Sequence, residues 1–183
     1  MSILKLLYFP NNELRTIAKN VKKIDNKINL LINNMIQTMY AYKGIGLAAT
    51  QIGIHKRIIV IDISKKQNNP LIFINPKLTI QNKNQISNEE GCLSIPQQKY
   101  FIFRYKTVKV QAKNLINENF EIEADNLLSC CLQHEIDHLN GILFIDYLSN
   151  LKYQRVYKKM KKFHQKIIRH KKNKIIYNYN ECK

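Results

Sequence analysis

The sequence lacks an apolar run that approaches the roughly 20 residues a transmembrane helix requires. It also lacks internal repeats and linkers rich in glycine, serine or proline, so its 183 residues predict one domain with its own hydrophobic core. The first ten residues do not show the basic, apolar and small-residue segments of a signal peptide. We therefore expect a cytoplasmic protein that does not enter a membrane, and we expect a monomer.

Acidic residues are scarce, because 13 Asp and Glu stand against 30 Lys and Arg, which gives a net charge of +17. Such an excess attracts nucleic acid or another polyanion. The sequence is also crowded with Lys, Asn, Ile and Tyr, the residues of AT-rich codons, and this bias accounts for the charge without a function. Both explanations stay open for the chain as a whole.

Cysteine is also sparse, and the arrangement of the four cysteines does not suit a disulfide framework. Cys130 and Cys131 are adjacent, which is a poor geometry for pairing with each other. In a reducing compartment, metal binding or burial is the expected use of these thiols.

Hydrophobic periodicity predicts the order of the structural elements. Apolar residues at spacings of three and four follow Asp25, a candidate N-cap, and predict a helix over residues 26–42. Further helices are expected over 126–139 and 149–170, and a polar loop over 82–89. Strands are predicted over 57–63, 71–74, 78–80, 105–112 and 120–124. This order indicates an α+β fold, with mostly antiparallel, short-stranded sheets packed around a central helix at 126–139, and a C-terminal helix.

Residues 134–138 read His-Glu-Ile-Asp-His and carry the clearest chemical pattern. On a helix, His134 and His138 lie one turn apart and face the same way, so both imidazoles can bind one metal ion. Glu135 lies close enough to exchange protons with a water on that metal. This is the H-E-x-x-H pattern of metal-dependent hydrolases, whose catalytic sites commonly use three protein ligands.

The third ligand must come from elsewhere. One class of metallopeptidases supplies a downstream histidine, but Phe144 stands at that position, which disfavours the class. Cys130 lies on the same ridge as His134 and His138, but that ridge spans about 12 Å along the helix. Metal bonds of only about 2.0–2.3 Å do not easily bridge it. Cys92 comes from a different part of the chain, and we favour Cys92, His134 and His138 as the ligand set.

Three blocks of sequence, in this order and spacing, resemble the signature motifs of the peptide deformylase family. They are Gly44-Ile45-Gly46-Leu47-Ala48-Ala49-Thr50-Gln51, Glu90-Gly91-Cys92-Leu93-Ser94 and Gln133-His134-Glu135-Ile136-Asp137-His138. The resemblance covers nearly the whole chain. It implies a small α+β enzyme that removes the formyl group from the N-terminal formyl-methionine of nascent polypeptides and releases formate.

The resemblance also implies roles for single residues. Cys92, His134 and His138 match the metal ligands, and Glu135 matches the general acid/base that serves attack of a metal-bound hydroxide on the formyl carbon. Gln51 and the backbone N–H of Leu93 match the groups that stabilise the oxyanion. The substrate-binding residues correspond to Ile45, Gly46, Gly91, Leu127, Cys130 and Cys131.

The cofactor implied is one divalent metal ion per chain. The resemblance implies Fe²⁺, with Ni²⁺, Co²⁺ and Zn²⁺ as alternatives. The thiolate ligand agrees with this group, because it suits such ions better than Mg²⁺ or Ca²⁺. Glu90, which precedes Gly91 and Cys92, is expected to serve the structure by pairing with Arg104. The alternative function is a metallopeptidase of the HExxH type, which would use the same chemistry on internal peptide bonds.

The segment 151–174 contains 11 Lys and Arg residues around an apolar stripe, which predicts an amphipathic helix with a basic face. Such a helix is either a solvated surface element or a dock for ribosomal RNA near the exit of nascent chains, and both interpretations stay open. We accordingly assign residues 1–150 to a catalytic domain, and residues 151–183 to a basic C-terminal helix and tail continuous with it.

Overall fold

The computed structural model describes residues 2–180, with side chains described through residue 166. Within this part of the chain the fold is α+β, with three α-helices and two antiparallel sheets. The helices are α1 (Asn26–Ala41), α2 (Asn126–Leu139) and α3 (Asn150–Asn180), and the 3₁₀ turns are η1 (Asn12–Arg15), η2 (Ala49–Ile52) and η3 (Phe144–Tyr147). The strands are β1 (Gly46–Ala48), β2 (Ile58–Ile61), β3 (Leu71–Ile80), β4 (Gln85–Cys92), β5 (Ile95–Tyr105), β6 (Thr107–Lys113) and β7 (Asn119–Asp125).

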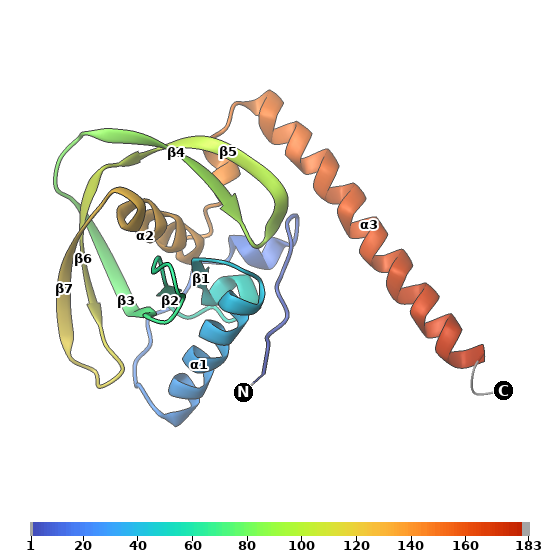
Figure 1. The fold of residues 1–183 in the computed structure, drawn as a ribbon, viewed down its shortest axis with the longest axis horizontal. Coiled ribbons are helices and arrows are strands. Elements are labelled where there is room, and N and C mark those ends of the chain that lie inside the picture. Colours follow the sequence, from blue (N-terminus) through green and yellow to red (C-terminus); the bar gives the residue numbers. More distant parts are fainter. Residues whose placement is uncertain (1, 181–183) are drawn as a thin grey trace.

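The two sheets enclose α2. Five strands pair in the order β1-β2-β3-β6-β7, and β4 pairs with β5 in a separate two-stranded sheet. Figure 1 shows α2 between the curved five-stranded sheet and the β4–β5 pair, and the helix contacts strands of both. Side chains on several faces of α2 are therefore buried, which explains why polar residues of this helix must find partners inside the protein.

The predicted helices 26–42 and 126–139 correspond to α1 and α2. The Asp25 side chain accepts a hydrogen bond of 3.0 Å from the Ile28 N–H and caps α1, whose buried face then carries Ile28, Ile32 and Met35. α2 begins directly after Asp125, although that side chain makes no capping hydrogen bond. The hairpin predicted from 105–112 and 120–124 is formed by β6 and β7.

The expectation of a loop over residues 82–89 was wrong, because most of this segment belongs to β4. Its partner β5, an 11-residue strand, was not predicted either. β4 exposes polar side chains on one face, so its composition resembles a loop even though its backbone groups pair with β5. The two short strands predicted at 71–74 and 78–80 form the single strand β3, with an irregularity between Ile74 and Lys77 where Asn75 has a φ of 54°.

The C-terminal helix is longer than predicted. α3 extends from Asn150 to Asn180, and Figure 1 shows it running along one side of the molecule and away from it. Val156 and Met160 are buried in a cluster with Phe9, Phe144 and other apolar side chains, which fixes the first turns of α3 to the body. The end of the predicted tail, residues 181–183, lies outside the described residues. No helix in the described chain combines the length and apolar character needed to cross a bilayer.

Candidate metal centre and active site

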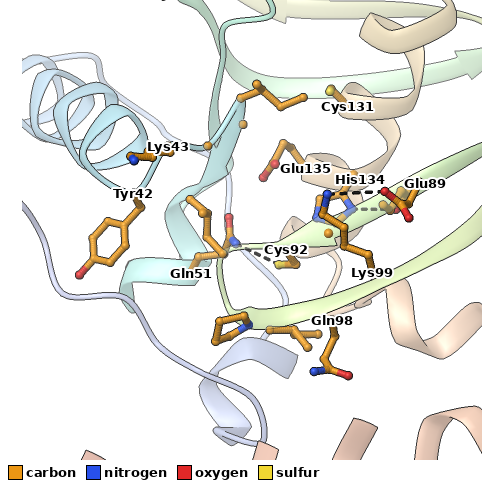
Figure 2. Close-up of a pocket in the computed structure, with 18 of the residues that line it drawn as sticks. Tyr42, Lys43, Gln51, Glu89, Cys92, Gln98, Lys99, Cys131, His134 and Glu135 are labelled. Atoms are coloured by element: carbon orange, nitrogen blue, oxygen red, sulfur yellow. Dashed lines mark hydrogen bonds and ion pairs between the residues drawn. The ribbon is translucent and has the colours of Figure 1, made fainter. Parts of the chain in front are cut away.

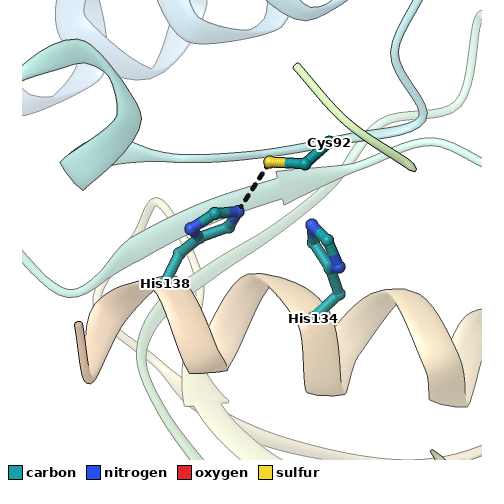
Figure 3. Close-up of side chains that lie close together, drawn as sticks. All are labelled: Cys92, His134 and His138. Carbon is teal, nitrogen blue, oxygen red and sulfur yellow. Dashed lines mark hydrogen bonds between the residues drawn. The ribbon is translucent and has the colours of Figure 1, made fainter. Parts of the chain in front are cut away.

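Three metal-ligating side chains converge between α2 and β4. Ligand atoms of Cys92, His134 and His138 all lie within 4.8 Å of one another, and Cys92 Sγ is 3.2 Å from His138 Nε2. His134 and His138 project from successive turns of α2, while Cys92 approaches from across the helix at the end of β4 (Figure 3). Cys130 is not part of this group. One thiolate and two imidazoles at this spacing fit a tetrahedral divalent ion with one position left for water or substrate.

Glu90 holds the outer side of His134. Its Oε2 lies 2.8 Å from His134 Nδ1, which directs Nε2 of the same ring toward Cys92. Arg104 donates to Glu90 from Nε at 2.6 Å and from Nη2 at 3.0 Å, so the expected Glu90–Arg104 pair is present. Burial alone would raise the pKa of Glu90, but the hydrogen bonds from His134 and Arg104 outweigh it and lower the pKa to about 2.

Glu135 has a different environment. Its side chain is buried, and its Oε2 has no hydrogen-bond partner in the described part of the chain. Burial is the main reason why the pKa of Glu135 is raised to about 7. A Cβ atom placed on Gly46 would collide with the Glu135 carboxylate, so glycine at this position of β1 makes room for the carboxylate next to His134.

Gln51 is fixed from both ends of its amide. Its Oε1 accepts a hydrogen bond of 2.8 Å from the Ala48 N–H, and its Nε2 lies 3.4 Å from Cys92 Sγ and 3.3 Å from Ser94 Oγ. The amide donor of Gln51 therefore points at the ligand group. Leu93 follows Cys92 directly, in the turn that joins β4 to β5. Figure 2 shows Gln51, Cys92 and Glu135 reaching the same space from three different elements.

This space is a cavity of about 520 Å³. The structure brings the whole predicted substrate-binding set to its wall, together with Gln51, Leu93, Cys92, His134 and Glu135. That set consists of Ile45, Gly46, Gly91, Leu127, Cys130 and Cys131. The third residue of the ligand group, His138, is almost fully buried.

Sequence reasoning missed several residues at this cavity. Tyr8, Tyr42, Lys43 and Gln98 also line it, but they come from segments without a chemical pattern. The contact between Glu90 and His134 was missed as well, because the two residues are 44 positions apart. The sequence could show that Glu90 needed a cation, but it could not show that a metal-ligating histidine shares the carboxylate.

Residues 3–154 match the family model for polypeptide deformylase. The chain belongs to this family. It is 52% identical over 174 residues to a peptide deformylase of Hamiltonella defensa, a match that covers 95% of this chain and 100% of the relative. It is 54% identical over 167 residues to a peptide deformylase of Buchnera aphidicola, covering 91% of this chain and 99% of the relative. The crystal structure of a peptide deformylase from Legionella pneumophila superimposes with a TM-score of 0.86 at 42% identity, covering 92% of this chain and 99% of that one.

Membership of the peptide deformylase family indicates which reaction takes place in the cavity. Peptide deformylases are metal-dependent enzymes that hydrolyse the N-terminal formyl-methionine amide of nascent peptides. The metallopeptidase alternative is not favoured, because the matched family covers the motif helix, the cysteine block and the glycine-rich block together.

Proposed function

We propose that Cys92, His134 and His138 hold the catalytic metal ion of this deformylase, and that Glu135, Gln51 and Leu93 carry out the chemistry beside it. The observation that supports this most directly is the convergence of the three ligand atoms next to a buried carboxylate oxygen that lacks a partner. A divalent ion bound there would lower the pKa of a water and polarise the formyl oxygen. The soft thiolate in the donor set suits Fe²⁺, Ni²⁺, Co²⁺ or Zn²⁺ better than Mg²⁺ or Ca²⁺. Among these we expect Fe²⁺, as the resemblance to the family implies.

Glu135 handles the protons. Its free Oε2 accepts a proton as water attacks the formyl carbon, and the same oxygen then delivers that proton to the departing amine nitrogen. The atoms of the reaction balance: one water and one N-formyl-methionyl peptide give formate and a peptide with a free N-terminal methionine. The absence of a side chain at Gly46 leaves room for this carboxylate, because a Cβ there would overlap it.

Gln51 and Leu93 stabilise the charge that develops on the formyl oxygen. The Gln51 amide is already oriented, because the Ala48 N–H holds its Oε1 and turns Nε2 toward Cys92. The Leu93 N–H belongs to the turn next to the same cysteine. Donors fixed before the reaction need no reorganisation when charge appears, and removing one such donor typically costs about 10²–10³ in rate.

The methionine side chain occupies the apolar part of the cavity. Cys130 and Cys131 contribute small, polarizable sulfur atoms beside Ile45 and Leu127. Gly91 lies on the exposed side of β4, where an added Cβ would meet nothing closer than the Lys99 Cγ at 3.4 Å. Packing inside the protein therefore does not require glycine here, and we assign its small size to close approach of the substrate backbone.

The decisive experiment measures formate release from formyl-Met-Ala-Ser by protein purified without oxygen and loaded with Fe²⁺ or Ni²⁺. Acetyl-Met-Ala-Ser is the matched substrate control, because it differs only by a methyl group on the acyl carbon. Denatured casein tests for cleavage of internal peptide bonds. We expect formate from the first substrate, little acetate from the second and no cleavage of the third.

Two results would overturn the proposal. Absence of formate release by folded, metal-loaded protein would refute the deformylase activity of this chain. Formate release at an equal rate after Cys92, His134 and His138 are each replaced by alanine would refute the ligand set. Reconstitution of the metal-free protein with Fe²⁺, Ni²⁺, Co²⁺ and Zn²⁺ in turn ranks the metals.

We also propose that the enzyme works as a cytosolic monomer and that the basic helix α3 docks it on ribosomal RNA. Residues 1–150 would then form the catalytic part, and residues 151–183 the docking part. The described side chains support this division, because Val156 and Met160 attach the start of α3 to the body and the basic side chains of the same turns are mostly exposed. Phosphate contacts would make ribosome binding fall steeply with salt.

The docking test must leave the packed start of α3 intact. Deletion after Asn150 would remove Val156 and Met160 from the core, so a truncation after Lys166 is the better variant. This truncation removes Arg169, Lys171, Lys172 and Lys174 from the sequence. We expect weaker sedimentation with ribosomes, a shallower salt dependence and unchanged turnover of a free tripeptide. Equal ribosome binding by the truncated protein would exclude the deleted segment as the dock.

A further inference from the structure

A chain of polar side chains continues outward from Glu90. Arg104 donates to Glu90 and also, from Nη1, to Asp137 Oδ2 at 2.6 Å. The Tyr147 hydroxyl donates to the same Asp137 oxygen at 2.8 Å. The series His134, Glu90, Arg104, Asp137 and Tyr147 therefore runs without a break from a candidate metal ligand to η3.

This series of hydrogen-bonded side chains connects the two sides of α2. Glu90 and His134 face the active-site cavity, whereas Arg104, Asp137 and Tyr147 line a second cavity of about 670 Å³. Arg104 is 4% exposed, so its guanidinium depends on protein partners, while Tyr147 is 50% exposed. The last member of the chain can thus be altered at the surface without opening the core.

Tyr147 contacts two members of this series, Asp137 and Arg104. Its hydroxyl binds Asp137, and the Arg104 guanidinium carbon lies over its ring, 4.6 Å from the ring centroid. Asp137 Oδ2 receives both donors, so the phenol helps to fix the carboxylate that orients Arg104. Arg104 in turn makes two hydrogen bonds to Glu90, which leaves the Glu90 carboxylate little freedom to turn away from His134.

We propose that Asp137 and Tyr147 are positioning residues for His134, and that they act through Arg104 and Glu90. The inference rests on the proposed metal site. Groups that orient a metal-ligating histidine typically change metal affinity or activity by about 10–100-fold when they are removed. In this series Asp137 lies two contacts beyond Glu90 and the Tyr147 hydroxyl three, so their effects are expected at or below the lower end of that range.

The test measures how fast Co²⁺ leaves the loaded protein for a chelator, together with the visible absorption spectrum of the Co²⁺ form. Tyr147→Phe removes one hydroxyl and keeps the ring. Tyr157→Phe is the matched control, because it makes the same change in α3, where the ring packs against Phe9 rather than near α2. Asp137→Asn removes the charge that faces Arg104. Unfolding of the metal-free forms is followed in parallel.

We expect Tyr147→Phe to release Co²⁺ about three times faster than the wild type, and Asp137→Asn about ten times faster, with shifted absorption bands in both. Tyr157→Phe should match the wild type. The inference is overturned if Tyr147→Phe keeps the wild-type release rate and spectrum, or if both tyrosine variants change equally. Failure of the wild type to bind Co²⁺ would instead refute the proposed metal site itself.

Discussion

Two buried glutamates near His134, Glu90 and Glu135, have opposite electrostatic surroundings. Glu90 accepts hydrogen bonds from the histidine and from Arg104, and these bonds lower its pKa to about 2. Glu135 is equally buried, but its Oε2 has no partner in the described chain, and burial raises its pKa to about 7. The two side chains have the same exposed fraction, but Glu90 has charged and ring N–H donors that Glu135 lacks, and Glu135 also lies near the negative charges of Glu90 and Asp137.

This contrast separates a supporting carboxylate from a reacting one. A carboxylate whose two oxygens both accept hydrogen bonds from charged or ring N–H donors can orient a histidine, but these donors keep it ionised and make it a poor acceptor for a substrate proton. A carboxylate with an open oxygen is costly to bury, and such a group is retained where it serves chemistry. Substitutions at the two positions should therefore affect different properties of the protein.

The largest effect is expected from Glu135→Gln. The amide keeps the size of the side chain but cannot accept and return a proton, so kcat for formate release should fall by about 10²–10⁴. The bound metal should be retained, because Glu135 is not part of the ligand group. Steady-state kinetics beside a metal assay measure both properties. A variant with normal kcat would show that another group moves the proton.

Gly46→Ala tests whether the position of the Glu135 carboxylate matters for turnover. The new methyl group would occupy the space of the Glu135 carboxylate and force it to move. Displacement of a catalytic group by about 1 Å can cost about 10² in rate, and the loss should appear in kcat. Gly91→Ala is the comparison, because its Cβ fits beside Lys99 and its effect should fall on KM. Equal changes of kcat in both variants would contradict this assignment.

Glu90→Gln should change stability and metal retention more than turnover. Arg104 would keep Asp137 but lose its other buried carboxylate partner, which should lower the free energy of unfolding by about 3 kcal/mol. Metal affinity should fall by about 10–100-fold, while kcat at saturating metal stays within tenfold of the wild type. Chemical denaturation and metal titration measure the two effects. If Glu90→Gln kept wild-type stability and metal affinity, Glu90 would not have the supporting role that distinguishes it from Glu135.

Local patterns in the sequence were sufficient to predict α2, the helix that carries His134 and His138. The expected range 126–139 agrees with the bounds of α2, and the turn that follows contains Gly141, whose φ of 73° suits glycine. The spacing argument against Cys130 likewise agrees with the ligand group found in the structure. Both inferences depend only on geometry within one helix.

Contacts between distant segments could not be predicted in the same way. β4 presents polar side chains that only its pairing with β5 makes compatible with a strand. The three bonds that link His134 to Asp137 pass through β4 and β5, although the two residues are three positions apart in α2. A sequence pattern within α2 cannot encode this path, because it depends on where both strands lie.

The smallest effect is expected from Glu121→Gln, which places a third glutamate in the comparison. Glu121 on β7 pairs with Lys109 at 2.7 Å and also accepts a hydrogen bond from Gln111, but this group is exposed to solvent. Water already solvates both charges, so losing the pair should not change kcat, metal affinity or the denaturation midpoint measurably. A clear loss of stability would mean that a surface pair can matter as much as the Glu90–Arg104 pair, and that burial is not what separates them.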